Sequence, residues 1–512
     1  MLDNYVSYLK KNGLVVDLIA HISIPIIISV PTGTLLAFRL FYVNGGLDDL
    51  EHIKGPCLYT GKPAFSHASS HFKKEVKSKD RGNSIALHPK VKISLTRELG
   101  NLFVYGQQGS GKSVVLKPII SQVLQRGDRA VIYDQKREYT TIFGGPNAIL
   151  ISPTDKRGYA WDVGQDVKTI EQAESLAECF IISKGEEAEF WYRGARSILT
   201  GCIVACIHES GQWGWSDLRN MLNKPILEMR SAVESCYPDC LKCLEVDSKG
   251  TQSFMTILGT ELGWLNHLSK AWASNQKKRF SVTGWVKGNN RKNVLLIPND
   301  PLHSTISGPL CNAIITLLSK HILSLNDSRS RRIWYCLDEL GNLPRCEALF
   351  SIMTLGRSKG VRVLAGTQTT SQLETIYGSK GAETLLALFA NVVCLRLGAA
   401  GQSACQASHT FGKRTVIDKV ESFDDKGQRS VSRQRKDVLV VTPEQIVHLP
   451  QSGRDGVHGF LSVAGWEGVY KLTWPIISLE KKARAYVPAD WLTQSAGKSQ
   501  GRRLRRGSRV EC

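Results

Sequence analysis

A short apolar strand runs directly into a glycine-rich loop, and this junction constrains the fold more than any other feature of the sequence. The strand covers residues 102–105, and the loop reads GQQGSGKS. GxxxxGKS between a strand and a helix is a P-loop, whose backbone N–H groups and helix N-terminus surround phosphate oxygens. We expect Lys112 to contact the β and γ phosphates of ATP and Ser113 to bind Mg²⁺. The predicted nucleotide-binding residues are Gly106, Gln107, Gln108, Gly109, Ser110, Gly111, Lys112 and Ser113.

A second apolar strand ends in two acidic residues. Residues 333–337 read IWYCL, and Asp338 and Glu339 follow directly. P-loop hydrolases place one acid in the water shell of Mg²⁺ and can use another to accept a proton from the attacking water. We therefore expect Asp338 to hold the metal and Glu339 to act as the general base. An acidic helix N-cap is the alternative interpretation of this pair.

A third apolar strand, residues 361–366, is followed by Thr367 and Gln368. A polar side chain at the tip of a strand beside the acidic strand can contact the γ-phosphate. Gln368 is therefore a candidate sensor of the bound nucleotide, although strand position alone leaves this role open.

Longer stretches around these strands resemble the type IV coupling proteins of conjugation, of the TraD/TrwB type. The resemblance is carried by the run from Asp338 to Gly378, by GQQGSGKS with RGDRAVIYDQKREY (126–139), by FWYRGARSIL (190–199) and, more weakly, by FSVTGWV (280–286). It covers residues 98–475 in outline. It is more specific than the P-loop, because generic P-loop proteins share only that first motif.

The resemblance implies an α/β fold: a RecA-like P-loop NTPase motor domain with an inserted all-α domain, an N-terminal transmembrane anchor and assembly into a homo-hexamer. It supports the roles given above to Lys112, Ser113, Asp338, Glu339 and Gln368.

Two further basic residues match the family's motifs. Arg357 matches an arginine finger, which would enter the nucleotide site of the neighbouring subunit. Lys380 matches a basic residue near the phosphates. From the sequence pattern alone, the simpler interpretation is that both residues are charges on the protein surface.

One long apolar run, residues 18–38, is long enough to span a bilayer. Its prolines are tolerated in membrane helices, and it is too long for a cleaved signal peptide and lacks a clear cleavage site. A buried hairpin of a soluble protein is the alternative. The family usually has two membrane helices, whereas this chain shows one clear run. Since the larger basic excess follows the run, we expect an anchor in the bacterial inner membrane with the ATPase body in the cytoplasm.

The chain is strongly basic. It has 66 Lys and Arg against 46 Asp and Glu, a formal net charge of +20, which favours a polyanionic partner such as nucleic acid or an anionic membrane face. The Arg-rich tail after Gln494 is typical of a disordered segment that touches DNA, lipid headgroups or a protein partner. Candidate DNA contacts, each of which could be only a solvated charge, are Lys277, Lys278, Arg279, Lys287 and Arg291.

The 13 cysteines include one cluster, Cys236, Cys240 and Cys243, with a spacing that suits a metal. A fourth ligand is not obvious nearby, so thiols are the favoured interpretation and zinc the alternative.

Changes in sequence pattern divide the chain into five parts. Apolar residues recur at helical spacing, without strand patterns, over residues 166–276. A β-hairpin is predicted for residues 459–463 with 469–472. The polar stretch over residues 421–436 predicts an exposed loop. The predicted division is 1–45 membrane anchor, 46–97 membrane-proximal linker and first strands, 98–165 with 277–480 RecA-like nucleotide-binding domain, 166–276 all-α domain, and 481–512 basic tail.

Together these features predict a membrane-anchored, DNA-dependent ATPase. It would couple a relaxase–DNA complex to a type IV secretion channel and help pump single-stranded or double-stranded DNA, without sequence preference, in bacterial conjugation. One alternative is a membrane adaptor that recruits protein substrates, which would need no general base. The other is a generic DNA translocase resembling the FtsK or HerA groups.

Overall fold

The computed structural model describes residues 7, 8, 10–13, 29, 51–76, 83–183, 185, 187–273, 278–288, 292–423 and 429–492, with backbone alone for 419–423 and 429–431. The chain forms two compact units, one made of 1–59 with 413–438 and the other of 60–412 with 439–512. The predicted membrane run, apart from Ser29, and the Arg-rich tail after Gln494 lie outside the described residues.

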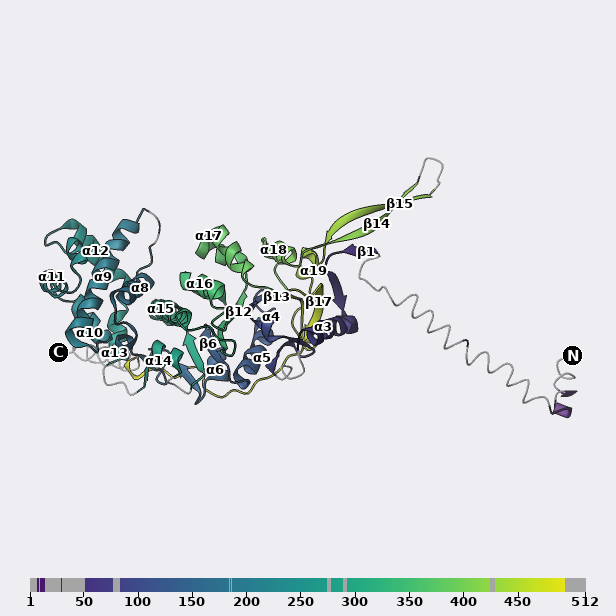
Figure 1. Ribbon diagram of the computed structural model, residues 1–512, viewed down its shortest axis with the longest axis horizontal. Coiled ribbons are helices and arrows are strands. Elements are labelled where there is room, and N and C mark those ends of the chain that lie inside the picture. The colour runs from purple at the N-terminus through teal and green to yellow at the C-terminus, as the bar shows by residue number, and fades with distance from the viewer. Residues whose placement is uncertain are drawn as a thin grey trace, which may run out of the picture. The chain divides into compact units, whose positions relative to one another are not determined.

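A ten-stranded sheet is the centre of the larger unit (Figure 1). Its strands, in spatial order, are β2 (Cys57–Thr60), β17 (Gly468–Trp474), β16 (Val457–Val463), β13 (Asn391–Leu395), β5 (Leu102–Tyr105), β12 (Val361–Thr367), β11 (Ile333–Leu337), β6 (Arg129–Asp134), β10 (Val294–Pro298) and β7 (Ala148–Leu150). The strands from β13 to β7 are parallel. Strands β5, β11 and β12 are buried along their whole length, which is typical of a parallel sheet covered on both faces.

The sheet order brings the three predicted strand ends together. Strand β12 lies between β5 and β11, with Thr367 beside Tyr105 and Ala365 beside Leu337. Because these strands are parallel, the loops that follow them leave the same edge of the sheet. This edge is where α/β proteins with open parallel sheets bind their ligands.

Helices cover the sheet and connect its strands. They are α5 (Lys112–Gln125), α6 (Glu138–Phe143), α14 (Val282–Lys287), η3 (Pro301–His303), α15 (Ser304–Leu323), η4 (Leu340–Asn342), α16 (Glu347–Leu355), α17 (Thr370–Ala387), α18 (Ser403–Thr410) and α19 (Pro443–Val447). In the described part of the chain, Pro301–Leu323 is the one helical segment long and apolar enough to cross a membrane. Its apolar window is 78% buried, so this segment is a core helix of the α/β unit.

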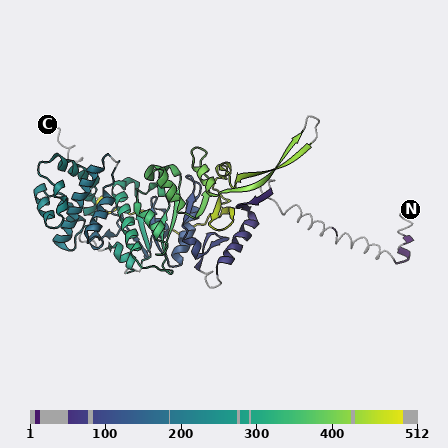
Figure 2. The same cartoon turned by 45° about the horizontal axis from the view of Figure 1, so that its top comes forward.

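A group of helices is inserted between two short strands, β8 (Ala160–Trp161) and β9 (Arg279–Phe280), which pair in parallel. Figures 1 and 2 show α9 to α13 gathered at one end of this unit. The helices are α7 (Val163–Asp166), α8 (Ile170–Phe180), α9 (Glu189–Ser210), α10 (Trp215–Leu222), α11 (Ile226–Glu234), η2 (Pro238–Cys243), α12 (Lys249–Glu261) and α13 (Leu265–Ala271). The described residues between the two strands form no other strand.

The predicted C-terminal hairpin is confirmed, because β16 and β17 pair antiparallel. The hairpin also extends the main sheet, since β16 pairs antiparallel with β13. Helix α3 (Gly61–Glu75), the hairpin of β3 (Ile85–His88) and β4 (Val91–Ile93), and the short helix α4 (Leu95–Glu98) precede the P-loop strand.

The smaller unit is a three-stranded sheet of β1 (Glu51–Lys54), β14 (Lys413–Phe423) and β15 (Arg429–Leu439). The prediction of an exposed loop over 421–436 is therefore wrong, because both ends of that stretch are strands. Residues 432–437 of β15 are all exposed. A strand with no buried side has no alternation of apolar and polar residues, so the sequence pattern did not reveal it.

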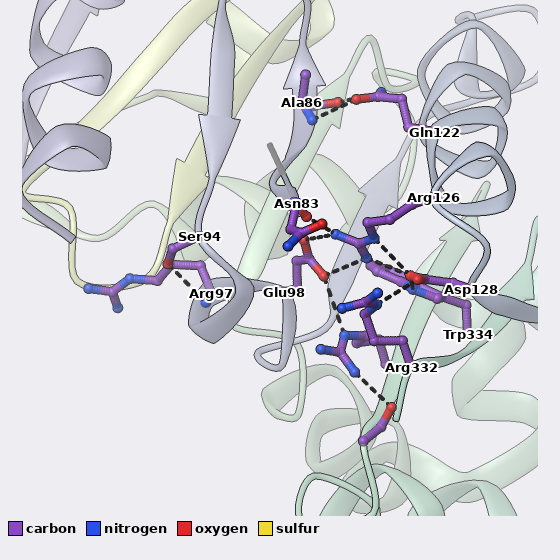
Figure 3. Close-up of polar contacts among 12 residues, drawn as sticks. Asn83, Ala86, Ser94, Arg97, Glu98, Gln122, Arg126, Asp128, Arg332 and Trp334 are labelled. Carbon is purple, nitrogen blue, oxygen red and sulfur yellow. Dashed lines mark hydrogen bonds and ion pairs between the residues drawn. The ribbon is translucent and has the colours of Figure 1, made fainter. Parts of the chain in front are cut away.

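A buried network of charges lies where the parallel strands of the main sheet begin, at the end opposite to the P-loop (Figure 3). Asp128, just before β6, accepts hydrogen bonds from Arg126 Nε at 3.0 Å, Arg332 Nε at 2.6 Å and Trp334 Nε1 at 3.0 Å. Glu98 accepts from both terminal nitrogens of Arg126, at 2.7 and 2.9 Å. These bonds join the segments that enter strands β5, β6 and β11, so they fix the strand starts relative to one another.

Candidate functional site

The loop between β5 and α5 has a conformation that requires glycine at two positions. Gly109 and Gly111 adopt φ angles of +77° and +96°, in the left-handed region that other residues rarely enter. A Cβ on Gly111 would also collide with the side chain of Val457 in β16. Ser452 donates a hydrogen bond of 2.6 Å to the carbonyl oxygen of Gly109, so the C-terminal hairpin region supports the loop.

The other predicted loop residues lie around this turn. Gly106 and Ser110 are buried, Gln107 and Ser113 are half-buried, and Gln108 is exposed. The N–H of Gln107 donates to the carbonyl oxygen of Arg396 after β13, at 3.0 Å. The loop is therefore held both by the segment that follows β13 and by the segment that precedes β16.

Lys112 begins helix α5, and its ammonium turns back into the loop. Its Nζ donates to the carbonyl oxygen of Gly106 at 2.7 Å and lies 3.3 Å from Glu339 Oε2. The side chains of Lys112 and Glu339 are only 10% and 8% exposed. Burial lowers the pKa of Lys112, and the charges of Glu339 and Asp338 oppose this effect.

Glu339 is held by the strand next to its own. The Nε2 of Gln368 donates to Glu339 Oε2 at 2.9 Å, and the backbone N–H of Gln368 donates to Oε1 at 3.1 Å. The hydroxyl of Thr367 adds a hydrogen bond of 3.4 Å to Oε1. The structure thus brings Lys112, Glu339 and Gln368 into one connected group, with the carboxylate at its centre.

Asp338 precedes Glu339 in the chain and interacts electrostatically with Lys112. Burial raises its pKa to about 6, although the ammonium of Lys112 acts in the opposite direction. Its Oδ1 is buried, and in the part of the chain that the structure describes it has no hydrogen-bond partner; the hydroxyl oxygen of Ser110 is in the same situation. A free carboxylate oxygen, a free hydroxyl and a glycine-lined loop fit a nucleoside phosphate with hydrated Mg²⁺.

Arg357 and Lys380 lie outside this group. Arg357 is exposed in the turn between α16 and β12. Lys380 is exposed on α17, two residues after Gly378, where φ and ψ of 75° and 165° interrupt the helix. Among the described residues, no hydrogen bond or ion pair joins either side chain to the P-loop. Both positions are accessible to another chain, as the arginine-finger hypothesis requires for Arg357.

Sequence reasoning missed the residues that follow β6. Asp134 ends this strand fully buried, and its Oδ2 accepts from the N–H and hydroxyl of Thr140 at 2.6 and 2.7 Å. Tyr139 is buried beside Asp338 and Asp134, and burial followed by these negative charges raises its pKa. A strand ending in a polar residue was the available signal, because the same pattern had identified Asp338 and Gln368.

The three clustered cysteines lie in and next to η2. Burial raises the pKa of the Cys240 thiol to about 12, and its Sγ donates to the carbonyl oxygen of Tyr237 at 3.3 Å. In the described ranges, no group of three or more His, Cys, Asp or Glu side chains could hold a metal ion.

Comparison with known proteins places the fold and the site in context. The family described as "Type IV secretion-system coupling protein DNA-binding domain" matches residues 86–468. The coupling protein TraD of Escherichia coli (strain K12) is 25% identical over 293 residues, which are 56% of this chain and 40% of TraD. The chain thus matches less than half the length of this relative.

Solved structures agree with the fold. The bacterial conjugative coupling protein TrwBΔN70, in its unbound monoclinic form, has a TM-score of 0.73 and 24% identity, covering 87% of this chain and 98% of that chain. The plasmid coupling protein TrwB in complex with ADP and Mg²⁺ has a TM-score of 0.70 and 24% identity, covering 87% and 99%. These matches show the predicted α/β fold, a RecA-like P-loop NTPase with an all-α domain. Because the family match covers more than half of the chain, the chain belongs to the type IV secretion-system coupling protein family.

Proposed function

We propose that this chain is an ATP hydrolase that drives DNA transport as the coupling protein of a bacterial conjugation system. The observation that carries the proposal is the connected group of Lys112, Glu339 and Gln368 at the mouth of the P-loop. The TrwB structure with ADP and Mg²⁺ supports ATP as the substrate and Mg²⁺ as the cofactor.

Each residue of this group has a separate role in the proposed hydrolysis of ATP. Lys112 neutralises charge on the β and γ phosphates, and Glu339 accepts the proton of the attacking water. Gln368, bonded to both oxygens of Glu339, orients this carboxylate and can sense the γ-phosphate. Ser113 and Asp338 are the side chains that would hold Mg²⁺, which would offset the negative charge of the phosphates.

A complete site requires a second subunit. We propose a homo-hexamer in which Arg357 of one subunit stabilises charge on the phosphoryl group held by its neighbour, while Lys380 acts near the phosphates. The exposure of both side chains supports this arrangement. An arginine supplied by the neighbouring subunit would couple ATP hydrolysis to movement of the subunits within the hexameric ring.

The cargo and the location follow from charge and hydropathy. The net charge of +20 and the DNA-binding description of the family support DNA as the partner, contacted through its phosphates. The apolar run 18–38 supports an inner-membrane anchor, with the relaxase and the secretion channel as protein partners. We propose the division into 1–45, 46–97, 98–165 with 277–480, 166–276 and 481–512 as the functional parts.

The test uses the full chain, purified in detergent, with and without single-stranded DNA. We expect Mg²⁺-dependent ATP hydrolysis that DNA stimulates, and loss of plasmid transfer when a strain lacking the gene is complemented with Lys112→Ala. An enzyme that binds ATP but hydrolyses none, with or without DNA, would support a recruiting adaptor instead. Recovery of the full chain in the soluble fraction without detergent would contradict the anchor.

A further inference from the structure

The turn that begins at Glu339 is held by a buried tyrosine of the neighbouring strand. Tyr133 is the next-to-last residue of β6 and lies beside Leu337 of β11, two residues before Glu339. Its hydroxyl donates a hydrogen bond of 2.9 Å to the carbonyl oxygen of Asn342, the last residue of η4. The N–H of Asn342 donates to the carbonyl oxygen of Glu339 at 3.2 Å. The hydroxyl of Tyr133 therefore fixes the far end of the short turn that the expected general base begins.

A second buried side chain sets the direction of this hydroxyl. The Nδ2 of Asn299, which follows β10, donates to the hydroxyl oxygen of Tyr133 at 2.6 Å. The hydroxyl of Ser307 in α15 donates to Asn299 Oδ1 at 2.6 Å and so orients the amide. A tyrosine hydroxyl has a single proton to donate. Because Tyr133 accepts from Asn299, its own proton is directed to the carbonyl oxygen of Asn342.

The turn itself is short and closely packed. The Nδ2 of Asn342 donates to Oε1 of Gln135, just after β6, at 2.5 Å. A Cβ on Gly341, in the middle of the turn, would collide with the side chain of Gln372 in α17. Since only two residues separate Asn342 from Glu339, a shift of one end of the turn is passed to the other.

Support from the backbone matters because one side-chain contact of Glu339 involves a residue with another task. Lys112, 3.3 Å from Glu339 Oε2, is also the expected phosphate ligand, so bound phosphate competes for its ammonium. Gln368 and Thr367 remain as hydrogen-bond donors to the carboxylate. A general base must stay within hydrogen-bond reach of the water that it activates, and a misplacement of about 1 Å can cost about 100-fold in rate.

We propose that Tyr133 is a positioning residue for ATP hydrolysis. It acts through the carbonyl group of Asn342 to hold Glu339 in place for the attacking water, and Asn299 directs its proton to that carbonyl. Tyr133 does this through the turn and has no chemical role in the reaction. The inference rests on the proposed function, because it assigns a role within the proposed hydrolysis.

The test compares two variants of the full chain that each lose one buried tyrosine hydroxyl. Tyr133→Phe removes the bond to Asn342. Tyr335→Phe is the matched control, because Tyr335 is fully buried in β11 and its hydroxyl lies 3.2 Å from Oγ of Ser319 in α15. Steady-state turnover gives kcat and KM, a fluorescent ATP analogue gives affinity, and thermal unfolding midpoints give stability. Hydrogen exchange of the backbone over residues 339–343 reports on the turn without hydrolysis.

Both variants should lower the unfolding midpoint by similar amounts, since each loses one buried hydrogen bond. Only Tyr133→Phe should lower kcat, by about tenfold, with KM and analogue affinity within about twofold of the unmodified chain, because a misplaced base affects the chemical step more than binding. Exchange over residues 339–343 should be faster in Tyr133→Phe and unchanged in Tyr335→Phe. Equal kcat values for the two variants would overturn the proposal.

A double-mutant cycle tests the role of Asn299. Asn299→Ala should lower kcat by about threefold, because the hydroxyl of Tyr133 loses the donor that directs it. Combining it with Tyr133→Phe should give a kcat no lower than that of Tyr133→Phe alone, since both substitutions act through the same bond. Two losses that multiply would show that Asn299 acts by another route and would contradict the assigned chain of bonds.

The remaining outcomes separate this inference from the proposed function. If the unmodified chain hydrolyses no ATP, with or without DNA, the proposed function and the inference fail together. Normal hydrolysis by the unmodified chain, with equal kcat values in the two tyrosine variants, rejects the inference alone. A lower kcat for Tyr133→Phe without faster exchange over residues 339–343 would reject the route through Asn342.

Discussion

The Nζ of Lys112 lies 3.3 Å from Oε2 of Glu339, so the expected phosphate-binding cation contacts the expected general base. An ammonium that also bonds Gly106 has limited capacity for phosphate oxygens. Phosphate binding should therefore draw Lys112 away from the carboxylate. This movement would leave Glu339 free to accept a proton, which links substrate binding to the basicity of the catalytic group.

Glu339→Gln should bind ATP and hydrolyse it at least 100-fold more slowly, because an amide does not accept the proton from water. The measurement is steady-state ATP turnover, with binding followed by a fluorescent ATP analogue. Glu347→Gln removes the same charge at an exposed position and should keep normal turnover. Normal hydrolysis by Glu339→Gln would mean that another group is the base.

Gly111→Ala should destabilise the folded protein more than Gly109→Ala does. Both positions have left-handed φ angles, a strain of about 1–3 kcal/mol for alanine, but only the Gly111 substitution meets Val457. The free energy of unfolding without nucleotide measures the difference. Adding Val457→Ala should recover part of the loss for Gly111→Ala, and equal losses at the two glycines would contradict the packing described.

Asp128→Ala should cost about 3–5 kcal/mol of stability, because it leaves Arg126, Arg332 and Trp334 without their shared acceptor in the protein interior. Asp327→Ala is the matched control. Asp327 pairs with Lys359 but is 72% exposed, so its removal should cost less than about 1 kcal/mol. Chemical denaturation of both variants tests the contrast, and similar losses would show that the buried network contributes little.

His88 should make stability depend on pH. Its Nε2 lies 2.9 Å from the carbonyl oxygen of Thr473, and its Nδ1 accepts from the N–H of Lys90 at 3.1 Å, a pattern that the neutral ring with a proton on Nε2 satisfies. Burial lowers its pKa, and the charge of Lys90 acts in the same direction. This stabilising contribution is complete above pH 6.5 and is lost as the pH falls toward the lowered value.

Unfolding free energies at pH 7.5 and 5.5 test this prediction. The unmodified chain should lose more stability on acidification than His88→Gln, whose amide can still donate to Thr473 but cannot titrate. An equal loss in both proteins would place the pH dependence at other groups.

The sequence allowed us to predict which residues meet at the P-loop when they belong to short, continuous sequence patterns. The P-loop, the acidic pair after β11 and Gln368 after β12 each follow a buried strand, and parallel pairing brings the strand ends together. The packing of Val457 against Gly111 was not predictable, because these residues are far apart in the chain.

The strands β14 and β15 are elements that the hydropathy pattern of the sequence could not predict. Residues 432–437 show no side that avoids water, so hydropathy carried no information about them. Pairing through backbone groups, which any residue can supply, decides their conformation.

The parallel pairing of β8 with β9 places the two ends of the inserted helical segment next to each other. Ala160 lies beside Arg279 and Trp161 beside Phe280, so the chain leaves the α/β unit and re-enters it at neighbouring strands, about 4.8 Å apart. An insertion whose two ends nearly touch adds little strain to its host, whatever its length. The helices between Trp161 and Arg279 could therefore be exchanged for those of a relative without separating the two strands that join them to the α/β unit.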